Sequence, residues 1–309
     1  MKIVFFGSDE FAATNLEYIL KSCHQVVGCV TQPDTKQGRG MKLTLSPIKI
    51  LSAEHGIDYI QPVTLKDQLT VERLKEFKAD LFVVVAYGRL LTQEILNIPK
   101  IFCINVHGSL LPKYRGAAPI NWAILNGDTQ TGVTIQKMAL ALDAGDIISQ
   151  ETINIPPQMT ADVLRGQMAE LGAKLLIETL NQLEAGKSNV SPQDEKEVSF
   201  APKLSKEMGR IDWHDEAHII FNQIRGLKPW PGTVTTHKGK NLKILNAVPV
   251  PENLDQKPGT IVTVDKNGFT VACGQAALLI KEVQPEAGKS MSAFSYSAGH
   301  KILPGDMLV

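Results

Sequence analysis

Two polar side chains that follow an apolar run are the clearest candidates for chemistry in this sequence. The run Ile101–Ile104 predicts a short buried strand, and Asn105 and His107 come directly after it. Residues two apart on an extended segment point the same way. Here an asparagine amide could donate to an oxyanion, beside an imidazole that titrates near neutral pH. Open α/β sheets bind ligands at the carboxyl ends of their strands, so this is a candidate catalytic segment, unless its polar groups only satisfy the backbone.

A carboxylate in a second predicted loop is the third candidate. Asp143 lies within Ala141–Ile148, in a tight turn between apolar segments. An aspartate shortly before a glycine often serves turn geometry alone. If it lies beside His107, its carboxylate would fix the imidazole and stabilise the protonated form. The residues alone leave both roles open.

The elements around these residues alternate between strands and helices. Ile3–Phe6, Val26–Val30 and Leu81–Ala86 read as buried strands, and Ser8 is expected to cap the helix after the first of them. This order predicts an α/β domain with a doubly wound, Rossmann-like and mostly parallel sheet. A bound NAD is not expected, because only Gly7 stands where the pattern Gly-x-Gly-x-x-Gly is required.

A basic, glycine-containing segment interrupts this alternation. Thr31–Ser46 carries Lys36, Arg39 and Lys42 against a single acid, Asp34. A loop of this kind can approach phosphates. On charge alone, however, an irregular and solvated surface loop is the simpler interpretation.

The pattern changes in the last third of the chain. A long helix is expected to begin at Thr160, and residues 188–205 read as a linker between a domain at 1–187 and a domain at 206–309. Short strands in the second domain predict a small antiparallel barrel. They are expected at Thr233–Thr236, Leu242–Val248, Gly259–Val264, Gly268–Cys273 and Ala277–Val283. Trp213 and Trp230 are expected to be core anchors, since most tryptophans are largely buried.

Composition excludes several classes of protein. The 309 residues carry no net charge, so no global field attracts nucleic acid, and contacts to it would need local patches such as Lys238 and Lys240. The four cysteines have no zinc-type spacing, so we expect no metal and the reduced thiols of a cytoplasmic protein. No apolar run reaches the roughly 20 residues that span a bilayer, and no membrane association is expected.

The motifs together resemble the folate-dependent formyltransferases, over nearly the whole length of the chain. The matching segments are Asn105-x-His107, Ser109–Pro112, Tyr114–Pro119, Asp143-Ala144-Gly145, Phe200–Leu204, Ile211–Trp213 and Ile224–Gly232. One departure is Gly7-Ser8-Asp9-Glu10, where the family usually has Gly-Thr-Pro; it concerns the first turn and not the catalytic motif.

The resemblance implies 10-formyltetrahydrofolate as the donor and the free amine of methionyl initiator tRNA as the acceptor. It implies that Asn105, His107 and Asp143 are the catalytic residues. Residues implied to contact the folate are Ser109, Leu110, Leu111 and Pro112, with Arg89 and Leu90 near the pterin. The second domain would be an OB-like fold. The implied surface for tRNA consists of Lys36, Arg39, Lys42, Lys238 and Lys240.

The chemistry of such a reaction is consistent with these residue types. A formyl group on an aniline-like nitrogen is an activated amide, and an aminoacyl ester has a largely neutral amine near pH 7. The amine can attack directly, so the protein must orient the two substrates, hold the oxyanion and move protons. We expect a monomer. Two alternatives stay open: a formyltransferase acting on a small amine, such as an amino sugar or glycinamide ribonucleotide, and a catalytically inert RNA-binding module.

Overall fold

The computed structural model describes residues 1–37, 42–187, 189–252 and 255–309. It divides into two compact units. The first unit consists of Met1–Pro119, Gln130–Asn154 and Arg165–Pro202, and the second of Ile120–Thr129, Ile155–Leu164 and Lys203–Val309. The chain therefore enters the second unit for the last time after Pro202. No described helix is long and apolar enough to cross a membrane.

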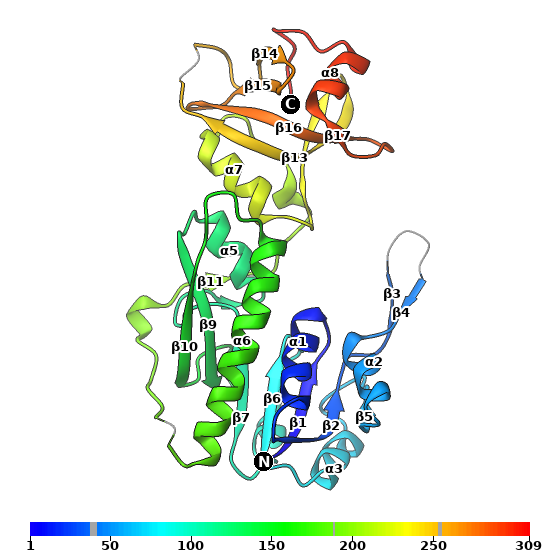
Figure 1. Cartoon of the computed structure of the whole chain (residues 1–309), viewed down its shortest axis with the longest axis vertical. Helices are drawn as coiled ribbons and strands as arrows, with labels where there is room; N and C mark the ends of the chain where they lie inside the picture. Colours follow the sequence, from blue (N-terminus) through cyan, green and yellow to red (C-terminus); the bar gives the residue numbers. More distant parts are fainter. Residues whose placement is uncertain (38–41, 188, 253–254) are drawn as a thin grey trace. The chain divides into compact units, whose positions relative to one another are not determined.

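A seven-stranded sheet organises the first unit, in the order β10-β9-β7-β6-β1-β2-β5 (Figure 1). Its strands are β1 (Lys2–Gly7), β2 (Gln25–Val30), β5 (Tyr59–Ile60), β6 (Leu81–Val85), β7 (Cys103–His107), β9 (Gln130–Lys137) and β10 (Ile147–Asn154). β5, β2, β1, β6 and β7 run parallel, and β9 and β10 add an antiparallel edge. The predicted Rossmann-like, mostly parallel sheet is confirmed.

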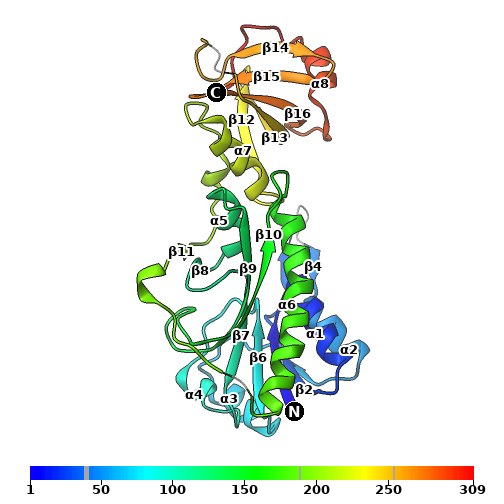
Figure 2. The ribbon, with the colours of Figure 1, turned by 60° about the vertical axis from the view of Figure 1, so that its left-hand side comes forward.

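Helices connect the parallel strands and cover the sheet. They are α1 (Glu10–Leu20), α2 (Pro47–Glu54), α3 (Gln68–Glu76), α4 (Gln93–Leu96) and the long α6 (Ala161–Glu184). Successive side chains of a strand point to opposite faces of the sheet, so the core has a part on each face. In one of these parts, Val4 and Phe82 share a cluster with Leu74 of α3 and Ile95 of α4. Figure 2 shows α6 running along the sheet. Gly172 permits this close packing, because a Cβ atom there would lie 3.2 Å from a Val106 methyl group.

The first helix is capped one residue later than expected. Asp9, not Ser8, is the N-cap of α1, and its Oδ1 accepts a hydrogen bond from the backbone N–H of Ala12 at 3.1 Å. The Ser8 hydroxyl instead accepts from the backbone N–H of Gln32 at 3.3 Å. The helix begins at Glu10, which places Ser8 outside hydrogen-bonding range of its first turn.

The β7 strand begins and ends later than the apolar run predicts. Ile101 is 43% exposed, and the strand covers Cys103–His107. Asn105 and His107 therefore lie on the strand and not in the loop after it. The reason is pairing on both sides: Asn105 lies opposite Val84 of β6 and opposite Gln136 of β9, so the backbone stays extended through His107.

The described part of the basic segment 31–46 contains two short strands. β3 (Thr35–Gln37) pairs with β4 (Lys42–Thr44) as an antiparallel hairpin, while Arg39 lies outside the described residues (Figure 1). The base of this hairpin is held by an ion pair of Asp34 with Lys49 at 2.6 Å. The Lys49 ammonium also lowers the pKa of the Asp34 carboxyl group.

The second unit is an antiparallel sheet with helices. Its strands β12 (Thr233–His237), β13 (Lys240–Val250), β16 (Ala277–Pro285), β15 (Gly268–Ala272) and β14 (Ile261–Asp265) lie in this order, and β17 (Met291–Ser292) pairs with β16. The main helices are α5 (Pro119–Leu125), which begins in the first unit, α7 (Ala217–Gly226) and α8 (Ala293–His300). The C-terminal residues bridge both edges: the Leu308 N–H donates to the Gly259 carbonyl, and the Val309 N–H to the Thr236 carbonyl. This closure is compatible with an OB-like barrel.

Trp213 and Trp230 differ in their exposure to solvent. Trp213 is 3% exposed and belongs to the core of the second unit, as expected. The expectation for Trp230 is wrong, because this side chain is 54% exposed. Residue 230 lies in the turn between α7 and β12, outside both elements that pack on the core.

Candidate active site

One face of the sheet gathers the polar residues at the carboxyl end of β7. Directly paired residues in a sheet project to the same side, and Asn105 pairs with Gln136, and His107 with Thr134. The intervening Val106 faces α6 instead. The sheet thus places two amides, an imidazole and a hydroxyl side by side, in the region where parallel sheets bind ligands.

The loop after β9 brings Asp143 to this face. Its Oδ1 lies 3.6 Å from Nδ1 of His107 and accepts hydrogen bonds from Nδ2 of Asn105 at 3.4 Å and from Nε2 of Gln136 at 3.0 Å. Its Oδ2 accepts from the backbone N–H of Gly116 at 2.9 Å. These donors hold the carboxylate in place, and only 11% of its side chain is exposed.

Both ring nitrogens of His107 face oxygen atoms. Nε2 lies 2.9 Å from the carbonyl oxygen of Tyr114, which can only accept, so this nitrogen carries a proton. Nδ1 faces the Asp143 carboxylate at 3.6 Å, just beyond hydrogen-bond distance. Nδ1 therefore has no close hydrogen-bond partner in the described structure, and a polar atom of a substrate could bind there.

Residues from the predicted linker fix the Asp143 loop. Nε2 of Gln193 donates to the carbonyl oxygens of Asp143 at 2.8 Å and Gly145 at 2.7 Å. Its Oε1 accepts from Nε of Arg115 at 3.0 Å, and the guanidinium of Arg115, which is 5% exposed, also pairs with Glu195 at 2.7 Å. Asp143 has φ of +50°, a conformation rare for non-glycine residues that these bonds help to hold.

Replacing Gln193 by leucine is expected to lower stability and turnover together. The carbonyl oxygens of Asp143 and Gly145 would lose their donor, which costs roughly 1–3 kcal/mol for a buried group. The freed loop should lower kcat about tenfold or more. Thermal unfolding and steady-state turnover measure the two effects. Glu195→Gln is the control, because this side chain is 73% exposed; equal losses in both variants would reject a specific role for Gln193.

The segment expected to contact the folate turns sharply after β7. The Ser109 hydroxyl donates to the Lys113 carbonyl at 2.6 Å, and the Leu111 N–H donates to Oγ1 of Thr134 at 3.0 Å. Leu110 packs against Gly132 of β9, where a Cβ atom would lie 2.5 Å from a leucine methyl group. Pro112 is half-buried. The loop is therefore tied to β9, which also carries Gln136.

Arg89 and Leu90 follow β6, the strand beside β7. A guanidinium nitrogen of Arg89 donates to the carbonyl oxygens of Pro62 and Val63, at 2.9 and 2.6 Å. Leu90 is 67% exposed. The order of the strands thus brings these residues to the same edge of the sheet as Asn105.

The basic residues expected to meet tRNA lie in two hairpins. Lys36 is on β3 and Lys42 on β4, and Arg39 lies outside the described residues. Lys238 and Lys240 are exposed at the β12–β13 turn. Lys238 already pairs with Asp306 at 3.0 Å, which lowers the pKa of that carboxyl group. The neighbouring His237 is buried at 3% exposure, so it does not extend this basic surface.

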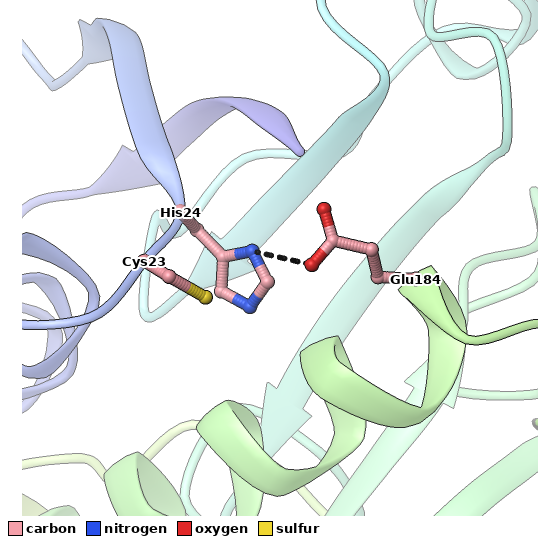
Figure 3. Close-up of side chains that lie close together, drawn as sticks. All are labelled: Cys23, His24 and Glu184. Atoms are coloured by element: carbon pink, nitrogen blue, oxygen red, sulfur yellow. Dashed lines mark ion pairs between the residues drawn. The ribbon is translucent and has the colours of Figure 1, made fainter.

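Among the described residues, one group of side chains could hold a metal ion: Cys23, His24 and Glu184 (Figure 3). Figure 3 shows the Glu184 carboxylate beside the imidazole of His24, an ion pair of 3.7 Å. The other oxygen of Glu184 accepts from the amino group of Met1 at 2.7 Å, so the carboxylate already has a cationic partner. Cys23 and His24 precede β2 and Glu184 ends α6, so the group lies at the opposite end of the parallel strands from Asn105.

Three of the four cysteines are poor candidates for a catalytic nucleophile. All four are free thiols, and Cys29, Cys103 and Cys273 are buried. Burial raises the pKa of these three thiols to about 12. The reactive thiolate is therefore scarce near neutral pH at those positions.

Known proteins share this fold and its motifs. A family model described as formyl transferase matches residues 1–180, and the model of the formyl transferase C-terminal domain matches residues 203–301. The chain therefore belongs to the formyl transferase family. Within it, full-length relatives bear the name methionyl-tRNA formyltransferase: the protein of Caldanaerobacter subterraneus is 44% identical over the whole of both chains. That of Geobacter metallireducens is 42% identical over 99% of this chain and 97% of its own.

Solved structures at lower identity share the fold. An N-formyltransferase from Helicobacter canadensis, in complex with folinic acid and dTDP-3-aminofucose, has a TM-score of 0.69 at 20% identity, over 93% of this chain and all of its own. HypX from Aquifex aeolicus, in complex with tetrahydrofolic acid, has a TM-score of 0.63 at 20% identity. This chain covers 96% of its own length but only 47% of HypX.

Proposed function

We propose that this formyltransferase transfers the formyl group of 10-formyltetrahydrofolate to the amino group of methionyl initiator tRNA. The observation that carries the proposal is the cluster of Asn105, His107 and Asp143 at the carboxyl end of β7. It occurs in a chain that matches proteins named methionyl-tRNA formyltransferase from end to end. The product, N-formylmethionyl-tRNA, would serve translation initiation in the cytoplasm.

The reaction needs no nucleophile from the protein. The neutral amine of the aminoacyl ester attacks the formyl carbon, a C–N bond forms, and the formyl oxygen becomes an oxyanion. The bond to the folate nitrogen then breaks, and that nitrogen takes a proton while the amine loses one. Orientation of the two substrates and stabilisation of the oxyanion would supply most of the rate enhancement.

Three side chains would divide this work. Nδ2 of Asn105 and the Nδ1 proton of His107 would donate to the oxyanion. Asp143 would keep His107 protonated and relay a proton, directly or through water, to the leaving nitrogen. The 3.6 Å separation between Nδ1 and Oδ1 is compatible with this role, because catalytic contacts often tighten only once substrate is bound.

The donor would bind at the edge formed by β6 and β7. We propose that Ser109, Leu110, Leu111 and Pro112 contact the folate, with Arg89 and Leu90 lining the side that takes the pterin. The exposed leucine side chain at 90 would supply an apolar surface for the planar ring. The carbonyl partners of Arg89 would set the conformation of the loop that carries both residues.

The acceptor would bind through local basic surfaces, with one molecule of enzyme acting as a monomer. Lys36, Arg39 and Lys42 would form one contact, and Lys238 and Lys240, within a tRNA-binding domain at residues 206–309, the other. A linker at 188–205 would separate this domain from the catalytic domain at 1–187. Phosphate contacts release counterions, so salt should weaken binding.

Affinity for tRNA is expected to fall about tenfold or more between about 50 and about 200 mM salt. Filter binding or fluorescence anisotropy measures the slope of log Kd against log salt. Lys240→Ala should reduce that slope by roughly 0.7–0.9, the value for one phosphate contact. Lys238→Ala should reduce it less, because Asp306 already neutralises this ammonium. A flat salt dependence would contradict phosphate recognition by these residues.

A panel of acceptors tests the proposed substrate. Purified enzyme and 10-formyltetrahydrofolate are mixed with methionyl initiator tRNA, an amino-sugar nucleotide or glycinamide ribonucleotide. We expect transfer to methionyl-tRNA alone. Transfer to a small amine would assign a different substrate, and tRNA binding without transfer would identify an inert RNA-binding module.

A further inference from the structure

Gln136 is a buried amide of the site, and only one of its two polar side-chain atoms has a hydrogen-bond partner. It lies on β9 opposite Asn105 and is 2% exposed. Its Nε2 donates to Oδ1 of Asp143 at 3.0 Å. Its Oε1 has no hydrogen-bond partner in the described structure. The carboxylate can only accept, so the amide must present nitrogen to Asp143 and leave its oxygen unpaired.

This arrangement is unfavourable for stability. A buried acceptor without a partner costs roughly 1–3 kcal/mol, and an apolar side chain of similar volume would remove that cost. The neighbours of Gln136 on the other face of β9, Val133 and Ile135, are such residues and are fully buried. A side chain selected only for packing at position 136 would be apolar as well. The benefit of a glutamine at position 136 must therefore come from its side-chain hydrogen bond to Asp143.

That bond acts on the oxygen of Asp143 that matters for the reaction. Oδ1 faces Nδ1 of His107 and Nδ2 of Asn105, while Oδ2 is held by the backbone of Gly116. His107 is the titratable side chain placed in ion-pair range of this carboxylate in the described structure. Because the separations to His107 and Asn105 are long, the bond of Gln136 is the shortest that fixes Oδ1.

We propose that Gln136 is a positioning residue of the formyl transfer, which acts by holding Oδ1 of Asp143 against His107 and Asn105. The proposal rests on the catalytic roles proposed above for those three residues. Gln136 contributes no proton and contacts no reacting atom. It holds Oδ1 of the carboxylate in place, at the expense of an unpaired carbonyl oxygen of its own.

Two substitutions that differ in their pH response test this role. Gln136→Met removes the donor and the unpaired oxygen, so we expect a melting temperature equal to or above that of the wild type. Its kcat should fall about ten- to a hundredfold, the scale of a misplaced catalytic group, with KM for both substrates nearly unchanged.

Gln136→Glu should be rescued by acid. Ionised, the new carboxylate repels Asp143 and cannot donate; protonated, it donates as the amide did. Its activity relative to wild type should therefore rise as pH falls, whereas that of Gln136→Met should not rise. Asn15→Ala is the matched control, since Asn15 in α1 also has a buried carbonyl oxygen without a partner. Its pH profile should match that of the wild type.

Wild-type transfer to methionyl-tRNA is the internal reference. If the wild type forms no N-formylmethionyl-tRNA, the proposed substrate is wrong, independently of Gln136. If the wild type is active and both variants keep its kcat and pH profile, the positioning role is overturned. The positioning role is also overturned if the two variants respond to pH in the same way. Equal responses would indicate a purely structural defect, which is the same for methionine and for a titrating glutamate.

Discussion

Asp143→Asn is expected to lower turnover by about two to four powers of ten, the range for lost acid–base assistance, with the fold intact. The two side chains have the same shape, but the amide loses the charge that faces Nδ1 of His107 at 3.6 Å. Its NH2 group would also face one of the present donors, Gln136 or the backbone of Gly116. Steady-state formylation of methionyl-tRNA measures the loss, and circular dichroism with thermal melting verifies the fold.

A nearby acid provides the control for that variant. Asp146 lies three residues further along the same loop, and its backbone carbonyl accepts from the N–H of Lys137 at 2.8 Å. Asp146→Asn preserves this backbone bond, so turnover should stay near that of the wild type. Near-wild-type turnover in Asp143→Asn would remove the carboxylate from the mechanism.

Gly145→Ala is expected to reduce kcat about a hundredfold although it adds a single methyl group. A Cβ atom at Gly145 would lie only 1.6 Å from the carbonyl oxygen of Lys137, so the backbone must move. Asp143 lies two residues earlier on the same tight loop and would move with it. A shift of roughly 1 Å in a catalytic group can cost about two powers of ten. Turnover and melting temperature, measured together, separate this effect from global unfolding.

Gly166→Ala is the matched control, at a position with room for the added methyl group. Gly166 is an exposed glycine of α6, and a Cβ atom there would meet no atom within 4 Å. Alanine in an exposed helix interior is favoured over glycine by up to about 1 kcal/mol, so the melting temperature should rise and turnover should not change. If Gly145→Ala keeps full activity, the loop does not hold Asp143 as tightly as the contacts indicate.

Much of the first unit could be predicted because its signals are local. The continuous apolar run Leu81–Ala86 indicates a strand buried on both faces, and it forms β6 between β1 and β7. The position of the candidate site follows from the same order of elements, because ligands bind at the carboxyl ends of such strands. The motif with Asn105 and His107 can therefore be assigned to the carboxyl end of a strand from the sequence alone.

The remaining site residues depend on pairing between distant segments. Gln136 meets Asp143 only through the register of β9 against β7, and no local pattern determines that register. Gln193 lies 50 residues beyond Asp143 in a segment whose composition indicates a linker. The polar character of these residues does not indicate a place in the site, because amides are common on protein surfaces. Their burial and contacts could be found only in three dimensions.

The hairpin at 35–44 and Trp230 differed from expectation for related reasons. Glycines and basic residues indicate an irregular loop, yet pairing of Lys36 with Leu43 forms a short ladder. Tryptophan is usually buried, but the turn after α7 leaves Trp230 54% exposed. In both cases the path of the main chain outweighed the average preference of the residue type.

A single-turnover experiment tests most directly whether this polar cluster promotes direct transfer. Enzyme in excess is mixed with formyl-labelled 10-formyltetrahydrofolate and methionyl initiator tRNA, and samples are quenched in acid over time. We predict that the label passes from folate to the methionyl amine in one phase, which Asp143→Asn slows by about two to four powers of ten. Without acceptor, no label should stay on the protein. A labelled protein formed from the donor alone, or an unchanged phase in the variant, would contradict direct attack assisted by Asn105, His107 and Asp143.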